Sequence, residues 1–259
     1  MRGERGTAGA QSIRRAVKLL RILAAGQEHG VRLTDVAAES GLNRPTVHRM
    51  LRVLAEEGAV EQDPATRRYL VGQEVSLLGL ARTARFPIRA IAEPSLRHIA
   101  EQCGDTVFLT IRSGLDSVCV DRRLGAYPVK VLSIEIGVRR PLGVGVGGLV
   151  LLALLSPEEA AVILRANEAR LAQHQLSVPK LMERMRAARA RGYAWSDAGV
   201  VKGTRALSVP VFNAEKQAVA AISVAAMANR LTPVRMPGLV AMMREQAAEI
   251  SRRHARVRR

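Results

Sequence analysis

A short segment near the N-terminus carries cationic side chains at helical spacing. On a helical wheel of residues 44–54, one sector gathers the apolar residues Val47, Met50, Leu51 and Leu54. The opposite sector holds Arg44, Pro45, His48, Arg49 and Arg52. Guanidinium groups offer paired donors that match phosphate oxygens and the O6 and N7 acceptors of guanine. A helix that buries one side and presents cations on the other meets the requirement for a recognition helix in a DNA major groove.

Each polar side chain of this helix is compatible with more than one role. Arg44 and Arg49 are candidates for guanine edges, and Thr46 is a candidate for a phosphate oxygen or a thymine methyl group. Because phosphate contacts outnumber base contacts in protein–DNA complexes, any one arginine is also compatible with a solvated helix face. His48 is compatible with a DNA contact or with a structural role.

Two shorter helices should precede this one and position it. We expect Ser12 to cap a first helix that ends at about Ala25. Its buried stripe should comprise Ile13, Val17, Leu20 and Leu23. Thr34 should cap the second helix and is also a candidate for DNA contact. After a break at Gly41, Asn43 should cap the cationic helix, with Pro45 in its first turn and an end at Gly58.

A hairpin is expected directly after the three helices. Residues 59–62 and 67–71 are β-prone and flank Asp63-Pro64-Ala65-Thr66, a turn signal. Three helices followed by a hairpin indicate a winged helix-turn-helix. Arg67 and Arg68 at the tip are expected to lie along the phosphate backbone, and Tyr69 is expected to pack at the base.

The next helix reads as a linker between two domains. It runs from Gln73 to about Arg85, with Val75 and Leu78 in line, and Pro87 closes it. Its apolar stripe fits a dimer seam or packing within the chain. We therefore expect a disordered arm over 1–10, a winged helix-turn-helix over 11–72, a linker helix over 73–87 and a second domain over 88–255, with the boundary near Phe86.

The second domain mixes helices with mostly antiparallel strands, which indicates an α+β class. Strands are expected over 106–112, 117–123, 130–136, 206–212 and 218–226. Helices are expected over 88–102, 147–155, 157–172, 179–191 and 236–253.

A glycine cluster, Pro141-Leu142-Gly143-Val144-Gly145-Val146-Gly147-Gly148, is the notable motif of this domain. A dinucleotide loop does not fit, because no βαβ unit with an acidic residue about 20 positions on is evident. The motif fits a loop that brings backbone N–H groups toward a small anion at a helix N-terminus. A tight turn of purely structural purpose fits as well.

The amino-acid composition limits the kinds of partner that the protein could bind. The 259 residues include 40 Lys and Arg against 23 Asp and Glu, a formal charge of +17, which favours a polyanionic partner. The chain has only three Phe, three Tyr and one Trp, too few for base-stacking platforms. Its two cysteines, Cys103 and Cys119, lack metal-ligand spacing and suit a reducing compartment. Since we find neither a membrane span nor a secretion signal, we expect a cytoplasmic protein without membrane contact.

The chain resembles the IclR-type bacterial transcriptional regulators from about Gln11 to Ala255. The amino-terminal likeness is carried by LTDVAAESGLNRPTVHRMLRVLAEEGAVEQDP and RRYLVGQEVSLLG. The carboxy-terminal likeness is carried by GVRRPLGVGVGGLVLLALL and RARGYAWSDAGVVKGTRALSVPVFNAEKQAVAAISVAA. The resemblance implies a winged helix-turn-helix joined by a linker helix to an effector-binding domain of GAF-like α/β architecture. It also implies homodimers or homotetramers on operators with dyad symmetry, and small effectors such as organic acids or aromatic catabolites.

The resemblance further implies an effector site. The positions that correspond are Val146, Gly147, Ser196 and Ala206. We expect the nearby residues Leu142, Gly145, Asp197 and Ser208 to belong to the same site. Some members have an acidic residue at Ser196 and a cysteine at Ala206, so this chain departs from the family pattern there. Asp197 either substitutes for the acid or caps a turn. We expect an effector that is larger or less polar than the smallest oxoacids.

No catalytic constellation, metal site or cofactor site is evident, and neither GxSxG nor HExxH occurs. We therefore predict a regulator whose DNA binding responds to an effector. A DNA binder without sequence preference and an enzyme fused to a DNA-binding head are the alternatives.

Overall fold

The computed structural model describes residues 10–85, 87–197 and 201–257. The chain divides into two compact units, Met1–Phe86 and Pro87–Arg259. The expected arm over residues 1–10 lies outside the described residues, apart from Ala10.

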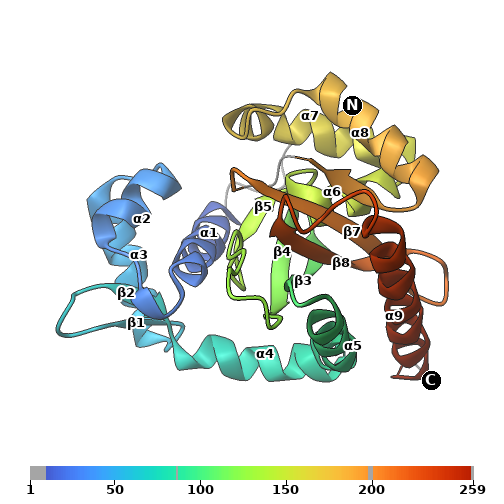
Figure 1. The fold of residues 1–259 in the computed structure, drawn as a ribbon. Coiled ribbons are helices and arrows are strands. Elements are labelled where there is room, and N and C mark those ends of the chain that lie inside the picture. The colour runs from blue at the N-terminus through green and yellow to red at the C-terminus, as the bar shows by residue number, and fades with distance from the viewer. Residues whose placement is uncertain (1–9, 86, 198–200, 258–259) are drawn as a thin grey trace. The chain divides into compact units, whose positions relative to one another are not determined.

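The first unit is a winged helix-turn-helix (Figure 1). Its elements in chain order are α1 (Gln11–Ala25), the short 3₁₀ helix η2 (Gln27–His29), α2 (Leu33–Ser40), α3 (Arg44–Glu56), β1 (Val60–Gln62), β2 (Tyr69–Val71) and α4 (Gln73–Arg85). β1 and β2 pair antiparallel to form the wing. Their common core is apolar and centres on Leu23, Val36, Val47, Leu51 and Tyr69.

Local sequence explains where α3 begins. Gly41 adopts a left-handed conformation, with φ of 71°, and ends α2. Two residues later the Asn43 side chain accepts a 2.9 Å hydrogen bond from the backbone N–H of Thr46. Pro45 occupies the first turn, where a missing N–H costs nothing. The predicted cap and proline are confirmed, and together they set the direction in which α3 leaves the turn.

The expected start of α1 is wrong. α1 begins at Gln11 with Ala10 as its N-cap, so Ser12 lies inside the helix. Ile13 and Val17 are 68% and 40% exposed, whereas the buried residues of the helix begin at Leu19. α2, α3 and the wing contact α1, and the unit's core therefore covers only its second half.

Thr34 is not the cap of α2. The helix begins at Leu33 with Arg32 as N-cap, and the Thr34 hydroxyl donates to the Asp35 carboxylate at 3.1 Å. The physical reason lies one residue earlier. Val31 forms an isolated bridge with Tyr69 of the wing, N–H to carbonyl at 2.9 Å, and this fixes the chain immediately before the helix.

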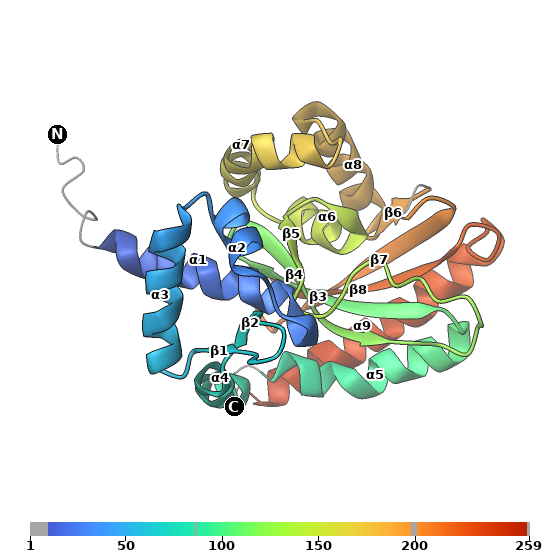
Figure 2. The same cartoon turned by 90° about the vertical axis from the view of Figure 1, so that its left-hand side faces the viewer.

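The second unit is a six-stranded antiparallel sheet with helices on both faces (Figures 1 and 2). The strand order is β5-β4-β3-β8-β7-β6. The strands are β3 (Thr106–Ser113), β4 (Asp116–Arg123), β5 (Arg139–Pro141), β6 (Ala194–Ser196), β7 (Thr204–Phe212) and β8 (Ala218–Met227). One face is covered by α5 (Ile88–Cys103) and α9 (Met236–Val257). The other carries α6 (Gly145–Ala153), α7 (Pro157–Gln173) and α8 (Val178–Arg191).

The strand expected over 130–136 is absent from the described sheet. Residues 130–138, here termed the cover segment, form a loop, and the edge strand is β5 further along. Val131 packs on Phe108 and Cys119 of the sheet, and its N–H donates to the Thr106 hydroxyl at 3.2 Å. Lys130 donates to the backbone carbonyls of Gly125 and Tyr127, which precede the cover segment. Val131 and Ile134 therefore pack on the sheet face, whereas Leu132 is exposed.

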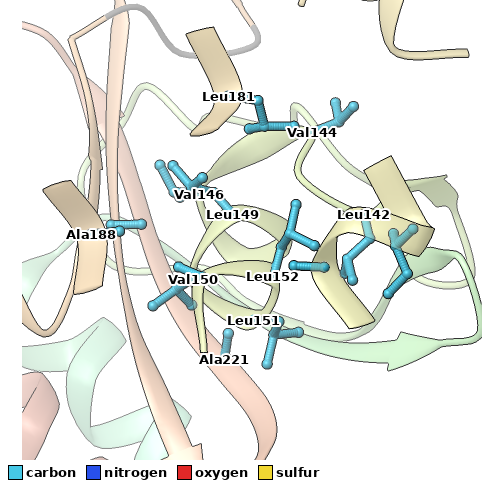
Figure 3. Packing of buried hydrophobic residues seen from close by; sticks show 14 of the residues in the cluster. Leu142, Val144, Val146, Leu149, Val150, Leu151, Leu152, Leu181, Ala188 and Ala221 are labelled. Atoms are coloured by element: carbon cyan, nitrogen blue, oxygen red, sulfur yellow. The ribbon is translucent and has the colours of Figure 1, made fainter. Parts of the chain in front are cut away.

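Helix α6 is the centre of the second unit's largest apolar cluster (Figure 3). Every residue of α6 after Gly145 is buried. Leu181 and Ala188 of α8 pack on it from one side and Ala221 of β8 from the sheet. A helix that is apolar all round requires such burial, and the start of α6 is consequently held in one place.

The Asn43 cap gives a direct test of how α3 is held. Asn43→Ala removes the acceptor for the Thr46 N–H, so the free energy of unfolding should fall by about 1 kcal/mol. Urea denaturation followed by circular dichroism measures the change. Asn43→Asp keeps an acceptor and serves as the control, and equal stability of the alanine and aspartate variants would contradict the assignment.

Candidate functional site

Helix α3 presents the two faces that its sequence indicates. Val47 and Leu51 are fully buried in the core of the first unit. Arg44, Pro45, His48, Arg49 and Arg52 are exposed, and Thr46 is half-buried. The polar face of α3 is thus accessible, and the packing of the opposite, apolar face fixes the helix in place.

The arginines of this face are available for an anion. Within the described part of the chain, Arg44 and Arg49 have no ion-pair partner. The Nε of Arg52 lies 3.6 Å from Oε1 of Glu56 in an exposed pair one helical turn apart, and such pairs contribute little energy. A phosphate or a base edge therefore meets little competition from the protein itself.

The wing holds its two arginines differently. Asp63 accepts from the Thr66 N–H at 2.6 Å and from the Thr66 hydroxyl at 2.8 Å; these bonds close the turn and lower the pKa of Asp63. Arg67 is exposed at the tip, with a φ of 58°. Arg68 is half-buried, and its guanidinium donates to the carbonyls of Gly30 at 3.1 Å and His29 at 3.4 Å. Arg68 thus braces the wing, while Arg67 points into solvent.

A cavity of about 380 Å³ lies in the second unit between the sheet and the start of α6. This volume is near the lower end of the range for small-molecule sites. Its floor is the sheet face that carries Thr110, Ser117, Thr204 and Ser223. Val144 to Gly148 close one side, and Ser133, Ile134 and Val138 of the cover segment close another.

Five of the positions assigned to an effector site line this cavity together. They are Gly145, Val146, Gly147, Ser196 and Ala206. The other three lie elsewhere. Leu142 is buried in the cluster around α6, and the fully buried Ser208 donates from its hydroxyl to the carbonyl of Ile222 at 2.9 Å. The Asp197 side chain is 77% exposed, with Oδ1 3.7 Å from Nε of Arg205.

The glycines let α6 approach the sheet closely. A Cβ on Gly147 would lie 2.9 Å from the Thr110 hydroxyl oxygen and 3.1 Å from that of Ser223. Gly145 has a φ of 71°, which residues with a Cβ rarely adopt. Val144 occupies the N-cap of α6 without a side-chain cap, so backbone N–H groups of the first turn are left for the cavity. The motif is both a structural turn and a cavity wall, and the antiparallel sheet around it is not a dinucleotide fold.

Two arginines of the cavity wall were not singled out from the sequence. Arg140 of β5 and Arg184 of α8 both line the cavity, and burial lowers the pKa of each guanidinium. One signal was present for Arg184. It shares a face of α8 with Leu181 and Ala188, so a charged residue stands in an apolar stripe. Arg140 follows another arginine in a three-residue strand too short to show alternation.

Among the residues that the structure describes, no three His, Cys, Asp or Glu side chains gather as a metal would need. The described helices include none with the length and apolarity of a membrane span.

Comparison with known proteins identifies the family. The family model of the IclR helix-turn-helix domain matches residues 12–64. That of the C-terminal part of the bacterial transcriptional regulator IclR matches residues 81–252. The chain belongs to the IclR family.

Relatives of this IclR-family chain are similar over nearly their whole length. It is 31% identical to the glycerol operon regulatory protein of Streptomyces griseus, covering 93% of this chain and 95% of the relative. It is 28% identical to the transcriptional repressor IclR of Escherichia coli, covering 95% and 90%. A solved IclR regulator from Silicibacter superposes with a TM-score of 0.80 and 26% identity, covering 94% and 96%.

These relatives are DNA-binding transcriptional regulators with a C-terminal effector-binding domain, and this chain has the same two parts. The chain is accordingly a DNA-binding transcriptional regulator whose second unit is the effector-binding domain. A solved IclR homolog from Microbacterium hydrocarbonoxydans, in complex with 4-hydroxybenzoate, superposes with a TM-score of 0.73. At 20% identity that likeness concerns the fold.

Substitution at Gly147 tests the close approach of α6 to the sheet. Gly147→Ala puts a methyl group against the Thr110 and Ser223 hydroxyls, so stability should fall by about 1–3 kcal/mol through overpacking. Gly238→Ala in α9, where a Cβ would meet nothing within 4 Å among the described atoms, is the control. The control should be neutral or stabilising by up to about 1 kcal/mol. Chemical denaturation measures the free energy of unfolding of both variants. A Gly147→Ala protein as stable as the control would refute the packing argument.

Proposed function

We propose that this regulator reads operator DNA with the exposed face of α3 and changes its operator affinity when a small organic effector occupies the cavity beside α6. The observation that carries the proposal is this cavity, with its uncapped helix start, in the same chain as a cation-presenting recognition helix. An organic acid or an aromatic catabolite is the effector class that suits it.

The residues on the exposed face of α3 and in the wing are proposed to have different roles at the operator. Arg44 and Arg49 are proposed to read base edges, and Thr46, His48 and Arg52 to contact the backbone or adjacent bases. Arg67 at the wing tip is proposed to contact phosphate. Arg68 is proposed to act mainly through the wing that it braces, since its guanidinium already donates to two carbonyls.

Coupling between effector and DNA needs an effector that binds two states of the protein with different affinities. The linker helix α4 directly follows the wing and precedes the effector-binding unit in sequence. We propose that a change at the cavity is passed through α4 and alters the spacing of paired DNA-reading domains.

The apolar residues of α4 support a homodimer. Leu77, Leu78 and Leu80 are 49%, 65% and 66% exposed. Large apolar side chains exposed within one turn of a helix are stabilised when a second copy covers them. A two-fold dimer, alone or doubled into a tetramer, suits operators with dyad symmetry.

We propose a regulatory role without a catalytic step, exercised in the cytoplasm where operators are found. Cys119 lines the cavity, but burial raises the pKa of its thiol to about 11. The thiol donates to the carbonyl of Asp121 at 3.4 Å. A protonated, hydrogen-bonded thiol is a poor nucleophile.

The proposed function is tested with the full chain in two steps. A thermal-shift screen of organic acids first finds compounds that raise the melting temperature. Fluorescence anisotropy with an operator selected from random duplexes then compares DNA affinity with and without each compound. Compounds that bind but never change operator affinity or cooperativity would overturn the proposal.

Arg49→Ala tests base reading by α3. Loss of a bidentate contact to a base should weaken operator binding by about 1–3 kcal/mol and relax the preference at one base pair. Anisotropy with the selected operator and its single-base variants measures both effects, with Arg21→Ala on exposed α1 surface as the control. Equal weakening on cognate and random duplexes would show that Arg49 contacts phosphate only.

Leu78→Glu tests the proposed seam. A charge placed in an apolar contact between two copies should dissociate the dimer and weaken binding to a two-half-site operator more than to one half-site. Sedimentation velocity gives the association state. Glu74→Gln on the same helix is the control, and an unchanged sedimentation coefficient for Leu78→Glu would exclude α4 as the seam.

A further inference from the structure

The cavity of the effector-binding unit has two cationic side chains that come from separate elements. Arg140 lies on β5, the strand at one edge of the sheet. Arg184 lies on α8, which packs beside α6 and beside β6, the strand at the other edge. Both side chains line the same cavity.

Arg140 has a buried donor without an acceptor. It stands opposite Ser117 in the β4–β5 ladder, and Ser117 also lines the cavity. Its Nη2 donates to the carbonyl of Ser133 at 2.8 Å, whereas its buried Nη1 has no hydrogen-bond partner in the described part of the chain. The neighbouring Arg139, by contrast, is paired with Asp116 and with Ser113.

Arg184 is a charge on the core-facing side of a helix. Leu181 and Ala188, one turn away on either side, are both buried. Arg189 on the same helix donates to the carbonyls of Ala153 and Leu155, but Arg184 has no hydrogen bond or ion pair among the described residues. Its guanidinium therefore faces the cavity with its donors unused.

The described lining of the cavity supplies no counter-charge for these two arginines. No Asp or Glu is among the described residues that line the cavity; the other polar groups there are hydroxyls, His174, Gln175 and Cys119. Arginine does not lose its proton in proteins, so both charges persist. Two cations taken partly out of water without an anion are unfavourable, and a ligand that brings two anions removes that cost.

We infer that the effector carries two separate acidic groups joined by an apolar spacer, as in a dicarboxylate. This inference rests on the proposed function of the cavity. One carboxylate is held by Arg140 and the backbone N–H groups at the start of α6, and the second is held by Arg184. The same cavity is also lined by the apolar side chains of Phe108, Ile134 and Ala206, and these contact the spacer.

The inference refines the expectation of a less polar site. The positions Ser196 and Ala206 do lack acidic or thiol groups. The polarity that they lack is present instead in two guanidinium groups on other elements. The spacer, not the acidic ends, is the part of the ligand that these small residues accommodate.

The test uses the full chain and matched pairs of ligands. Isothermal titration compares each unbranched dicarboxylate from succinate to pimelate, and phthalate, with its monomethyl ester. The best diacid should bind at least about tenfold more tightly than its ester, since a charge-assisted pair is lost. Arg184→Gln should remove this preference by weakening the diacid alone. Arg186→Gln, which alters an exposed arginine on the same helix, is the control and should keep it.

The melting temperature of each ligand-free variant shows whether the variant is correctly folded. Because Arg184 has no partner for its charge, Arg184→Gln should melt no lower than the unaltered protein when ligand is absent. A variant that melts lower shows that Arg184 has a structural partner, and this overturns the inference.

The remaining outcomes separate this inference from the proposed function. If monoacids bind as tightly as diacids and still change operator affinity, the two-anion inference is wrong and the proposed function stands. If diacids bind through Arg184 but operator affinity never changes, the inference stands and the proposed function is wrong. Binding of none of the diacids, or inorganic phosphate binding more tightly than all of them, overturns the inference.

Discussion

Helix α6 occupies the centre of the effector-binding unit because Gly147 and Gly148 have no side chains where the helix meets the sheet. A Cβ at Gly147 would stand 2.9 Å from the Thr110 hydroxyl oxygen, and a Cβ at Gly148 would stand 2.9 Å from that of Ser117. With hydrogen at both places, the helix lies directly on the sheet and its leucines fill the space beneath α8. This close contact determines where the first turn of α6 lies, and that turn forms one wall of the cavity.

The DNA-reading unit could be predicted from sequence to the extent that its signals are local. The cap at Asn43, the proline at Pro45 and the alternation of Val47 and Leu51 with arginines act within one or two turns. The predictions for this unit were wrong where contacts with residues distant in sequence determine the local structure. Thr34 is not the cap of α2 because Val31, just before the helix, pairs with Tyr69, which is 38 positions away. The stripe on α1 was misplaced because its first turns extend past the core.

The effector-binding unit was less predictable because its contacts are non-local. Long strands such as β3, β7 and β8 have enough apolar residues to be recognised. The cover segment has the composition of a strand, and only its packing on Phe108 and Cys119 reveals a loop. The glycine motif indicated a cavity wall, yet Arg140 and Arg184 are 44 positions apart and come together only in three dimensions.

The cover segment has a consequence for how such regulators diverge. It contributes Ser133, Ile134 and Val138 to the cavity, and it is irregular up to Gly137 and Val138, which hydrogen-bond to the backbone of Cys119. Loops accept changes of residue and length that strands do not. Replacements there exchange part of the ligand's surroundings while α6, its glycines and the sheet stay as they are. A lineage can thereby change which effector it accepts through a few substitutions and keep its scaffold.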